Sequence, residues 1–390
     1  MADIGLSVSD INVILNSVLS QAKLAPATVV DTSSFISVAQ TALKTAPEQT
    51  LQALGQVLSQ RSIVSIRPYE RKFKNLERSE EAWGNAVRKI SYADTGFIEN
   101  EEYKLEDGAS VDMYKVMKPN ILQTNFYGQT TYSQGWTMFS RQLDVAFSNP
   151  QDFARFVGGI IQNKADEREQ AHESLARATL TNLIGGVIAG STTGYVKVLT
   201  LYNTEKGTSL TATDVFRPEN FPGFLKFFVA TLKIYMKLMS ERSKLFQVQV
   251  TGKEITRHTP SSRARMYMYS PFIEKARTEV LADVFHDGYL KEENMEEVNY
   301  WQSINEADRM SIKVTAGYMD NTGTYKSKAV TNTKVLACLF DEDAVGYTTI
   351  HQTGGSTPYN PKGGYTNTFV NFNDRYYNDF TEKAIVFTLE

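Results

Sequence analysis

The residues of this chain that could do chemistry are few and widely spaced. The histidines are His172, His258, His286 and His351. None has the spacing of a metal-binding pair, and the His172-Glu173 pair lacks the second histidine of a zinc-hydrolase motif. Cys338 lies in an apolar run, which favours a small buried side chain over a nucleophile. We therefore predict no catalytic residue, no metal ligand and no cofactor.

Patterns that bind phosphate or nucleic acid are also weak. Gly252 and Lys253 stand alone, without the other residues of a nucleotide-binding loop. A basic and aromatic segment at 257–269 could grip phosphates and stack bases; the alternative is an ordinary loop followed by a strand. The formal net charge of -3 argues against dedicated DNA binding.

Composition is ordinary for a soluble globular protein. The 390 residues are 42% hydrophobic and 22% charged, enough for about two or three domains. A single cysteine cannot form an internal disulfide and suits a reducing cytoplasm. We expect no signal peptide and no membrane span, because the first residues lack a basic segment and no long uncharged apolar run occurs.

Two charged stretches surround the first predicted strand, at 86–93. The first stretch is basic and the second is acidic. A second strand is predicted at 111–117, so the acidic stretch falls in the connection of a long projecting hairpin. The charges are either solvated faces or contacts that fix register against neighbouring copies. The candidate inter-subunit contacts are Arg71, Lys72, Lys74, Glu99, Glu101, Glu102, Glu106 and Asp107.

The strongest helix pattern covers residues 149–184. Asn149 is a good N-cap, and Pro150 suits the first helical position. Apolar residues fall on one broad face, and Gly185-Gly186 is expected to end the helix. At 1.5 Å per residue the helix is about 50 Å long, which suits the backbone of an extended molecule.

The remaining patterns mix helices and strands without regular alternation, which favours an α+β fold. Helices are expected at 221–242 and from Ser270 onward. Strands are expected at 195–202, 246–250, 298–304 and 334–340. The first sixty residues contain three short amphipathic helix patterns, which must dock on the main body or on another chain.

The last stretch, at 359–390, is built to be anchored. It opens with a turn around Pro361, Gly363 and Gly364 and continues through an aromatic segment. It closes with a predicted strand at 385–389, so we expect a sheet to hold this end. The rings are interpreted as sheet-packing residues, with a carbohydrate platform as the alternative.

Taken in order, these features resemble the major capsid proteins of tailed bacteriophages, most closely the phi-29-like podovirus group. One part of the resemblance runs from Arg71 through the charged connection to 116–139. Another is the helix at 149–184. The most specific part is the pattern at 333–344 followed by the turn at 360–365 and the closing strands.

The resemblance implies the Hong Kong 97-type capsid fold. On this basis residues 1–66 would form a helical N-terminal arm, and 67–120 an extended loop. Residues 121–215 would form a peripheral domain with a spine helix at about 149–184. Residues 216–350 would form an axial domain, and 351–390 strands that return to the peripheral domain.

The family's function implies a structural protein rather than an enzyme. Copies of the chain would assemble through pentamers and hexamers into an icosahedral bacteriophage head, built in the host cytoplasm. The implied partners are other copies, scaffolding and portal proteins, and packaged double-stranded DNA contacted non-specifically. The alternatives are an encapsulin-like compartment shell and an enzyme with no recognisable motif.

Overall fold

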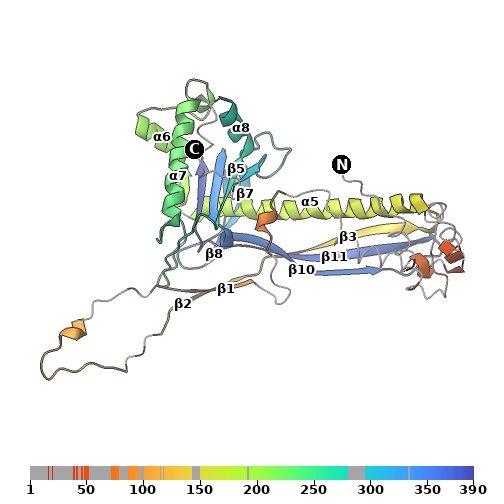
Figure 1. Cartoon of the computed structure of the whole chain (residues 1–390), viewed down its shortest axis with the longest axis horizontal. Coiled ribbons are helices and arrows are strands. Elements are labelled where there is room, and N and C mark those ends of the chain that lie inside the picture. Colours follow the sequence, from red (N-terminus) through yellow and green to blue (C-terminus); the bar gives the residue numbers. More distant parts are fainter. Residues whose placement is uncertain are drawn as a thin grey trace.

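A computed structural model gives the arrangement of the chain (Figure 1). It describes residues 72–78, 87–94, 96, 101–114, 116, 118–142, 150–190, 193–279, 295–332 and 334–390, with a few positions between 16 and 51. Almost all of the segment predicted to form three N-terminal helices lies outside these residues. Arg71 and Glu99 also lie outside them, as do the side chains of Glu101 and Glu102.

A helix of 41 residues, α5 (Pro150–Gly190), runs along much of the molecule (Figure 1). The predicted long helix is confirmed, but Gly185-Gly186 does not end it. A Cβ at Gly185 would lie 2.7 Å from Val314, and one at Gly186 would collide with the Phe380 ring. These glycines therefore serve close packing within the helix.

A three-stranded antiparallel sheet lies beside α5, in the order β10-β11-β3 (Figure 1). Its strands are β3 (Gln129–Phe139), β10 (Val345–Ser356) and β11 (Tyr365–Asn378). Alternate residues of β11 from Thr366 to Asp374 are buried. The ring of Phe372 lies under the Arg168 guanidinium of α5 at 3.7 Å, so this face of the sheet packs on the helix.

A five-stranded sheet forms the second unit, in the order β4-β12-β9-β5-β6. Its strands are β4 (Tyr195–Lys197), β5 (Ala264–Tyr269), β6 (Met295–Val298), β9 (Val335–Asp341) and β12 (Ala384–Thr388). One face is covered by helices, where Phe228 contacts Phe387. On the other face Tyr267 stacks between Phe73 and Phe340.

Three helices pack with this sheet in one hydrophobic core: α6 (Val198–Lys206), α7 (Phe221–Ser240) and α8 (Ser270–Glu279). The predicted helices at 221–242 and from Ser270 are confirmed, as are the strands at 334–340 and 385–389. A separate hairpin, β7 (Ile312–Met319) and β8 (Tyr325–Asn332), packs on the C-terminal part of α5.

Three strand predictions are wrong in whole or in part. Only Tyr195–Lys197 of the segment 195–202 is a strand, and the rest is α6, whose Leu199 and Tyr202 reach the core at helical spacing. The segment at 246–250 is not a strand, because Phe246 has a φ of 67°. In the segment 298–304 the strand ends at Val298.

A hairpin of β1 (Val87–Tyr92) and β2 (Ile121–Phe126) carries a connection that extends away from the rest of the molecule (Figure 1). A projecting hairpin is confirmed, but the second strand is not at 111–117. The described residues of that segment include a turn at Met113 and Tyr114 and no strand. The strand that pairs with β1 begins only at Ile121.

The anchored C-terminal stretch is confirmed. Asn360 closes the turn, because its side chain accepts hydrogen bonds from the Lys362 and Gly363 backbone N–H groups at 3.1 Å. Gly364 has a φ of 65°, as the turn requires. Strand β11 then runs between β10 and β3, and β12 lies between β4 and β9.

Candidate subunit-contact surfaces

The described part of the chain offers no site for metal chemistry and no membrane span. Among the residues that the structure describes, no group of three His, Cys, Asp or Glu side chains lies close enough to hold a metal ion. None of the described helices combines the length and apolar character needed to cross a bilayer. Cys338 is fully buried, and burial raises the pKa of its thiol, so it is a core residue. The exposed surfaces are candidates for contact with other molecules.

The projecting connection carries large apolar side chains that face solvent. Tyr103, Met113, Tyr114 and Val116 are 78 to 89% exposed. Scattered exposed apolar residues are normal, but several on one extended segment indicate an interaction site. The sequence analysis singled out only the charges of this segment. The signal it missed was the aromatic and methionine content between them.

The predicted acidic contacts lie on the same projection. Glu106 and Asp107 are exposed and flank a turn in which the Ala109 N–H donates to the Glu106 carbonyl at 3.0 Å. Gly108 has a φ of 89°, which permits this turn. The backbone of Glu101 and Glu102 starts η2 (Glu101–Lys104), the short helix at the far end of the projection (Figure 1).

The predicted basic contacts lie elsewhere. Lys72 and Lys74 belong to a segment around η1 (Lys74–Leu76) that packs on the body. Phe73 and Leu76 of this segment are buried, and the Asn75 side chain bonds the Tyr267 hydroxyl. The structure therefore does not bring the basic and acidic candidates together on one loop.

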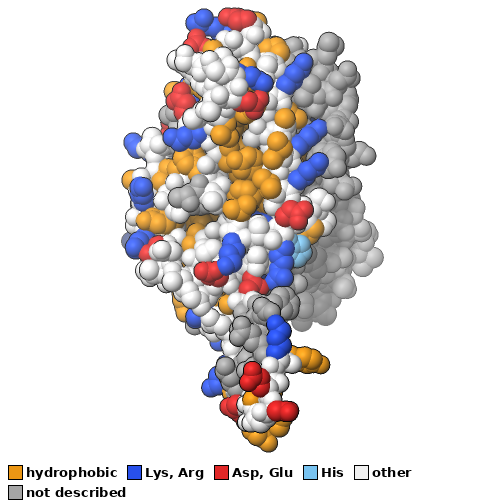
Figure 2. Space-filling view, turned by 90° about the vertical axis from the view of Figure 1, so that its left-hand side faces the viewer, with side chains coloured by type: hydrophobic (Ala, Val, Ile, Leu, Met, Phe, Trp, Pro, Cys, Tyr) orange, Lys and Arg blue, Asp and Glu red, His pale blue; other side chains and the backbone are white. Residues whose placement is uncertain are grey.

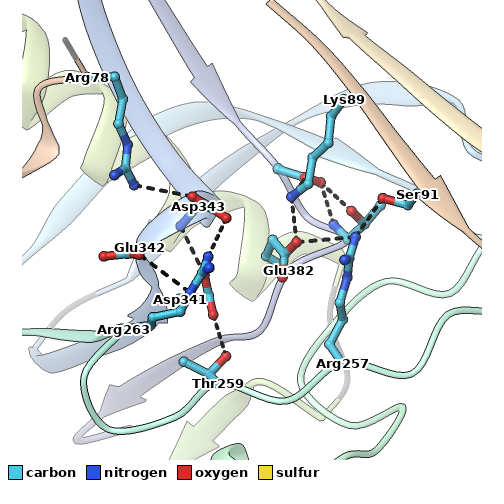
Figure 3. Close-up of polar contacts among 12 residues, drawn as sticks. Arg78, Lys89, Ser91, Arg257, Thr259, Arg263, Asp341, Glu342, Asp343 and Glu382 are labelled. Atoms are coloured by element: carbon cyan, nitrogen blue, oxygen red, sulfur yellow. Dashed lines mark hydrogen bonds and ion pairs between the residues drawn. The ribbon is translucent and has the colours of Figure 1, made fainter. Parts of the chain in front are cut away.

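Buried charges hold the base of the projection to the body (Figure 3). Lys89 of β1 contacts Asp379 at 2.6 Å and also contacts Glu382; both carboxylates are almost fully buried. Burial lowers the pKa of Lys89, but these two carboxylates outweigh it and hold that pKa above its ordinary value. Burial likewise raises the pKa of Glu382. We call these three residues the Lys89 lock.

A second set of contacts supports the lock. Arg257 bonds Glu382 at 3.2 Å and Ser91 at 2.8 Å. Farther along the projection, Asp94 pairs with Arg242 at 2.6 Å and accepts hydrogen bonds from Thr256, whose side chain is the main reason that the pKa of Asp94 is lowered. Ion pairs therefore hold the projection to the body at two places, Lys89 within its first strand and Asp94 just after it.

A neighbouring ion cluster joins the end of β9 to a loop (Figure 3). Arg263 contacts Asp341 at 3.1 Å and Glu342 at 3.4 Å, and it also pairs with Asp343. Thr259 donates to Asp341 at 2.7 Å. Burial lowers the pKa of Arg263, but Asp343 and Asp341 outweigh this effect and hold the pKa above its ordinary value, so the guanidinium stays charged. This cluster stabilises the body and presents no reactive group.

A groove of about 390 Å³, lined by polar and apolar side chains alike, lies between α5 and the segment at 300–304. Arg177 pairs with Glu173 at 2.7 Å, and its guanidinium lies 3.8 Å from the centre of the Tyr300 ring. These groups are paired with each other. The charged groups of the groove therefore stabilise the contact between α5 and the segment at 300–304.

The architecture is that of an extended subunit with a projecting loop. A long helix and sheet form an extended body, a second α+β unit lies at one end, and a projection with an apolar tip is fixed by ion pairs. Such a subunit is built to contact other subunits in a shell. The model of the Phi29-like phage major capsid protein family matches residues 60–388, and the chain belongs to that family.

Solved structures support the same fold. The chain is similar to a chain in the capsid structure of Staphylococcus phage Andhra, with 12% identity, a TM-score of 0.55 and coverage of 84% of this chain and 87% of that one. It is also similar to a chain in the structure of the head fiber and inner core protein gp22 of native bacteriophage P68, at 10% identity and a TM-score of 0.53, with 84% and 87% covered. No curated protein gives a significant match.

These findings confirm the expected class. The protein is a bacteriophage major capsid protein of mixed helix and sheet, a structural component of the virion capsid that assembles with copies of itself. The encapsulin alternative is not favoured.

Proposed function

We propose that copies of this chain form pentamers and hexamers that close an icosahedral head around double-stranded DNA. The observation that supports this most is the ion-locked projection with its exposed apolar tip. In one isolated subunit the large apolar side chains of the projection, Tyr103, Met113, Tyr114 and Val116, face solvent. Burying one such side chain against a neighbour contributes about 1.5 to 3 kcal/mol. Many modest contacts per subunit then add up across a closed shell.

Five parts of the chain have different places in the shell. Residues 1–66 form an arm, 67–120 the extended loop, 121–215 the peripheral domain, 216–350 the axial domain and 351–390 the returning strands. Helix α5 is the spine of the peripheral domain. Its length and its packing on the three-stranded sheet support this assignment.

The partners of the protein and its place of assembly follow from the same role. The protein acts as a structural subunit and not as an enzyme, and it assembles in the host cytoplasm. Scaffolding and portal proteins guide assembly, and packaged DNA is contacted without sequence specificity. The formal net charge of -3 argues against tight binding of DNA, so contact with the packaged genome is weak in this proposal.

The acidic residues of the projection serve to fix register against a neighbour, and Lys72 and Lys74 do so from the body. Exposed ion pairs add little affinity each, but they select one alignment over others. Arg71 and Glu99 belong to the same set of contacts by their position in the sequence.

Reversing Glu101 and Glu102 to Lys tests this role. We expect the double variant to fold normally but to give fewer shells, because like charges then meet at the contact. Electron microscopy and size-exclusion chromatography measure the shell yield, and circular dichroism checks folding. A normal shell yield would contradict the register role. Nuclease-protected DNA in native particles would support a genome shell, and protein cargo without DNA would support a compartment shell.

A further inference from the structure

Strand β3 forms one edge of the three-stranded sheet, and β10 forms the other (Figure 1). An edge strand presents a row of backbone N–H and C=O groups that can pair with a strand of another chain. Natural proteins usually protect such edges with charged side chains, prolines, bulges or covering segments. The two edges of this sheet differ in that protection.

The β10 edge is protected in two ways. The Arg78 N–H donates to the Tyr347 carbonyl at 2.9 Å, so the segment after η1 covers one end of the strand. An irregularity between Thr349 and His351 shifts the register in the middle of the strand. Both features hinder the addition of a further strand to β10.

The β3 edge has neither form of protection in the part of the chain that the structure describes. Its 11 residues pair with β11 without a bulge, and they include no charged residue and no proline. By contrast, basic and acidic side chains are spread over the end of the molecule that carries α7 and the projection (Figure 2). Among the other edge strands, β4 and β6 have only 3 and 4 residues, and β7 and β8 carry exposed lysines.

The register shows which backbone groups of β3 point to the open edge. The Tyr376 N–H donates to the Gly128 carbonyl at 3.2 Å, and the Ser140 N–H donates to the Gly364 carbonyl at 2.9 Å. Because bonded pairs alternate along an antiparallel ladder, the even-numbered residues of β3 bond to β11. The outward residues are Gln129, Thr131, Ser133, Gly135, Thr137 and Phe139, and all six are exposed. No hydrogen bond between described residues uses their backbone groups.

The open edge of β3 is complementary to itself. If two copies of β3 lie antiparallel over their full length, residue 131 meets 137 and residue 133 meets 135. Outward positions then meet outward positions, which gives about ten new backbone hydrogen bonds. No like charges oppose each other along the two strands. Gln134 at the midpoint bonds Glu167 at 2.7 Å, and that carboxylate already pairs with Lys164 at 2.9 Å.

We propose that β3 pairs with β3 of a second copy across a two-fold axis, so that the two three-stranded sheets become one continuous sheet. This inference rests on the proposed shell function and adds the surface that joins two subunits at its two-fold axes. A second copy is the occupant because the protein assembles with copies of itself and a two-fold contact uses the same surface on both subunits. A neighbour's β2 would cover only part of this edge, because β2 has 6 residues.

Chemical cross-linking in assembled particles tests the contact. A variant with Thr131→Cys and Thr137→Cys should give covalent dimers with dibromobimane, because these positions lie about 5.5 Å apart across the axis. Within one strand they are about 20 Å apart, so a link inside one subunit is excluded. The two single variants are the matched controls and should give no dimer. Native Cys338 is fully buried and does not interfere.

The other outcomes separate this contact from the shell function. Shells of the double variant that give no dimer would overturn the pairing and leave the shell function standing. A ladder of three or more linked subunits would show a head-to-tail contact and would also overturn it. Dimers from Thr131→Cys combined with Gln123→Cys would show that a neighbour's β2 occupies the edge instead. Failure of the unmodified protein to form shells under any condition would overturn both proposals.

A proline substitution tests the backbone pairing independently. Ser133→Pro removes an outward N–H and no bond to β11, so the subunit should still fold. Shell yield should fall by roughly tenfold, because two backbone hydrogen bonds are lost at each two-fold axis. Ser133→Ala keeps the N–H and should assemble like the unmodified protein. A normal shell yield from Ser133→Pro, with folding checked by circular dichroism, would contradict the strand pairing.

Discussion

At the scale of single residues, burial separates charges that stabilise the subunit from charges that are available to neighbours. Lys89 and Lys313 both lie in strands, in β1 and β7. Lys89 contacts two buried carboxylates, whereas the Lys313 side chain is exposed. Sequence alone did not separate them, because the partners Asp379 and Glu382 lie about three hundred residues away.

Replacing Lys89 with Met should destabilise the subunit by about 3 kcal/mol, because two buried carboxylates lose their main countercharge. Chemical denaturation followed by circular dichroism measures the free energy of unfolding. Lys313→Met is the matched control and should change it by less than about 0.5 kcal/mol. Equal effects of the two substitutions would show that the Lys89 lock does not stabilise the fold.

Lys383 gives a pH dependence of defined sign. It is fully buried, and its ammonium group donates to the Glu241 carbonyl at 2.6 Å and to the Ser243 hydroxyl at 3.0 Å. Burial lowers its pKa from 10.5 to about 8, and the nearby Glu241 charge only partly offsets this. Between these pH values the unfolded chain therefore holds more protons than the folded one.

The free energy of unfolding should consequently gain a contribution from Lys383 as the pH rises from about 8 to 10. Denaturation curves of the unmodified chain and of Lys383→Met across this pH range isolate the contribution of Lys383, since the other groups titrate alike in both proteins. The difference between the two proteins should grow with pH in favour of the unmodified chain. Parallel pH profiles would refute the lowered pKa.

At the scale of elements, the sequence predicted those whose signal is local and strong. The α5 helix, α7, β9 and β12 follow from caps and apolar patterns at 149–184, 221–242, 334–340 and 385–389. Short strand patterns were less reliable. Phe246 adopts a left-handed conformation, and the segment after Val298 turns to bury Trp301. In both places tertiary packing, and not the local sequence pattern, determines the backbone conformation.

The glycines of α5 illustrate how packing overrides a local stop signal. Gly186→Ala should destabilise the subunit by about 1 to 3 kcal/mol, because the added methyl group meets the Phe380 ring and the Gly317 carbonyl. Gly159→Ala is the matched control in the same helix, where a Cβ has open space, and should stabilise by about 0.5 to 1 kcal/mol. Thermal unfolding measures both, and a neutral Gly186→Ala would refute the close packing.

At the scale of the whole molecule, the order of features along the chain identified the capsid class, but the contact surfaces needed three dimensions. The candidates Lys72 and Glu106 belong to one charged region of the sequence but lie on the body and on the projection, respectively. The exposed apolar residues Ile234 and Leu238 of α7 were hidden in a helix pattern with apolar residues on more than one side. In a sequence, apolar residues of a subunit interface cannot be distinguished from apolar residues of the subunit's own core.

The apolar tip of the projection leads to the last prediction. A triple change of Tyr103, Met113 and Tyr114 to Ser should leave the free energy of unfolding of the subunit unchanged, because all three side chains are exposed in it. Shell yield should fall more than with the charge reversal at Glu101 and Glu102, since apolar burial contributes more than exposed ion pairs.

Ionic strength distinguishes the two contributions further. Added salt screens exposed charges within a Debye length but does not weaken apolar contact. Salt should therefore reduce the difference between the unmodified protein and the charge-reversal variant, and leave the triple serine variant defective. Tyr127→Ser, at the body end of the hairpin, controls for loss of one exposed ring. If salt restores assembly of the triple variant, charge and not apolar burial is what the projection contributes to the shell.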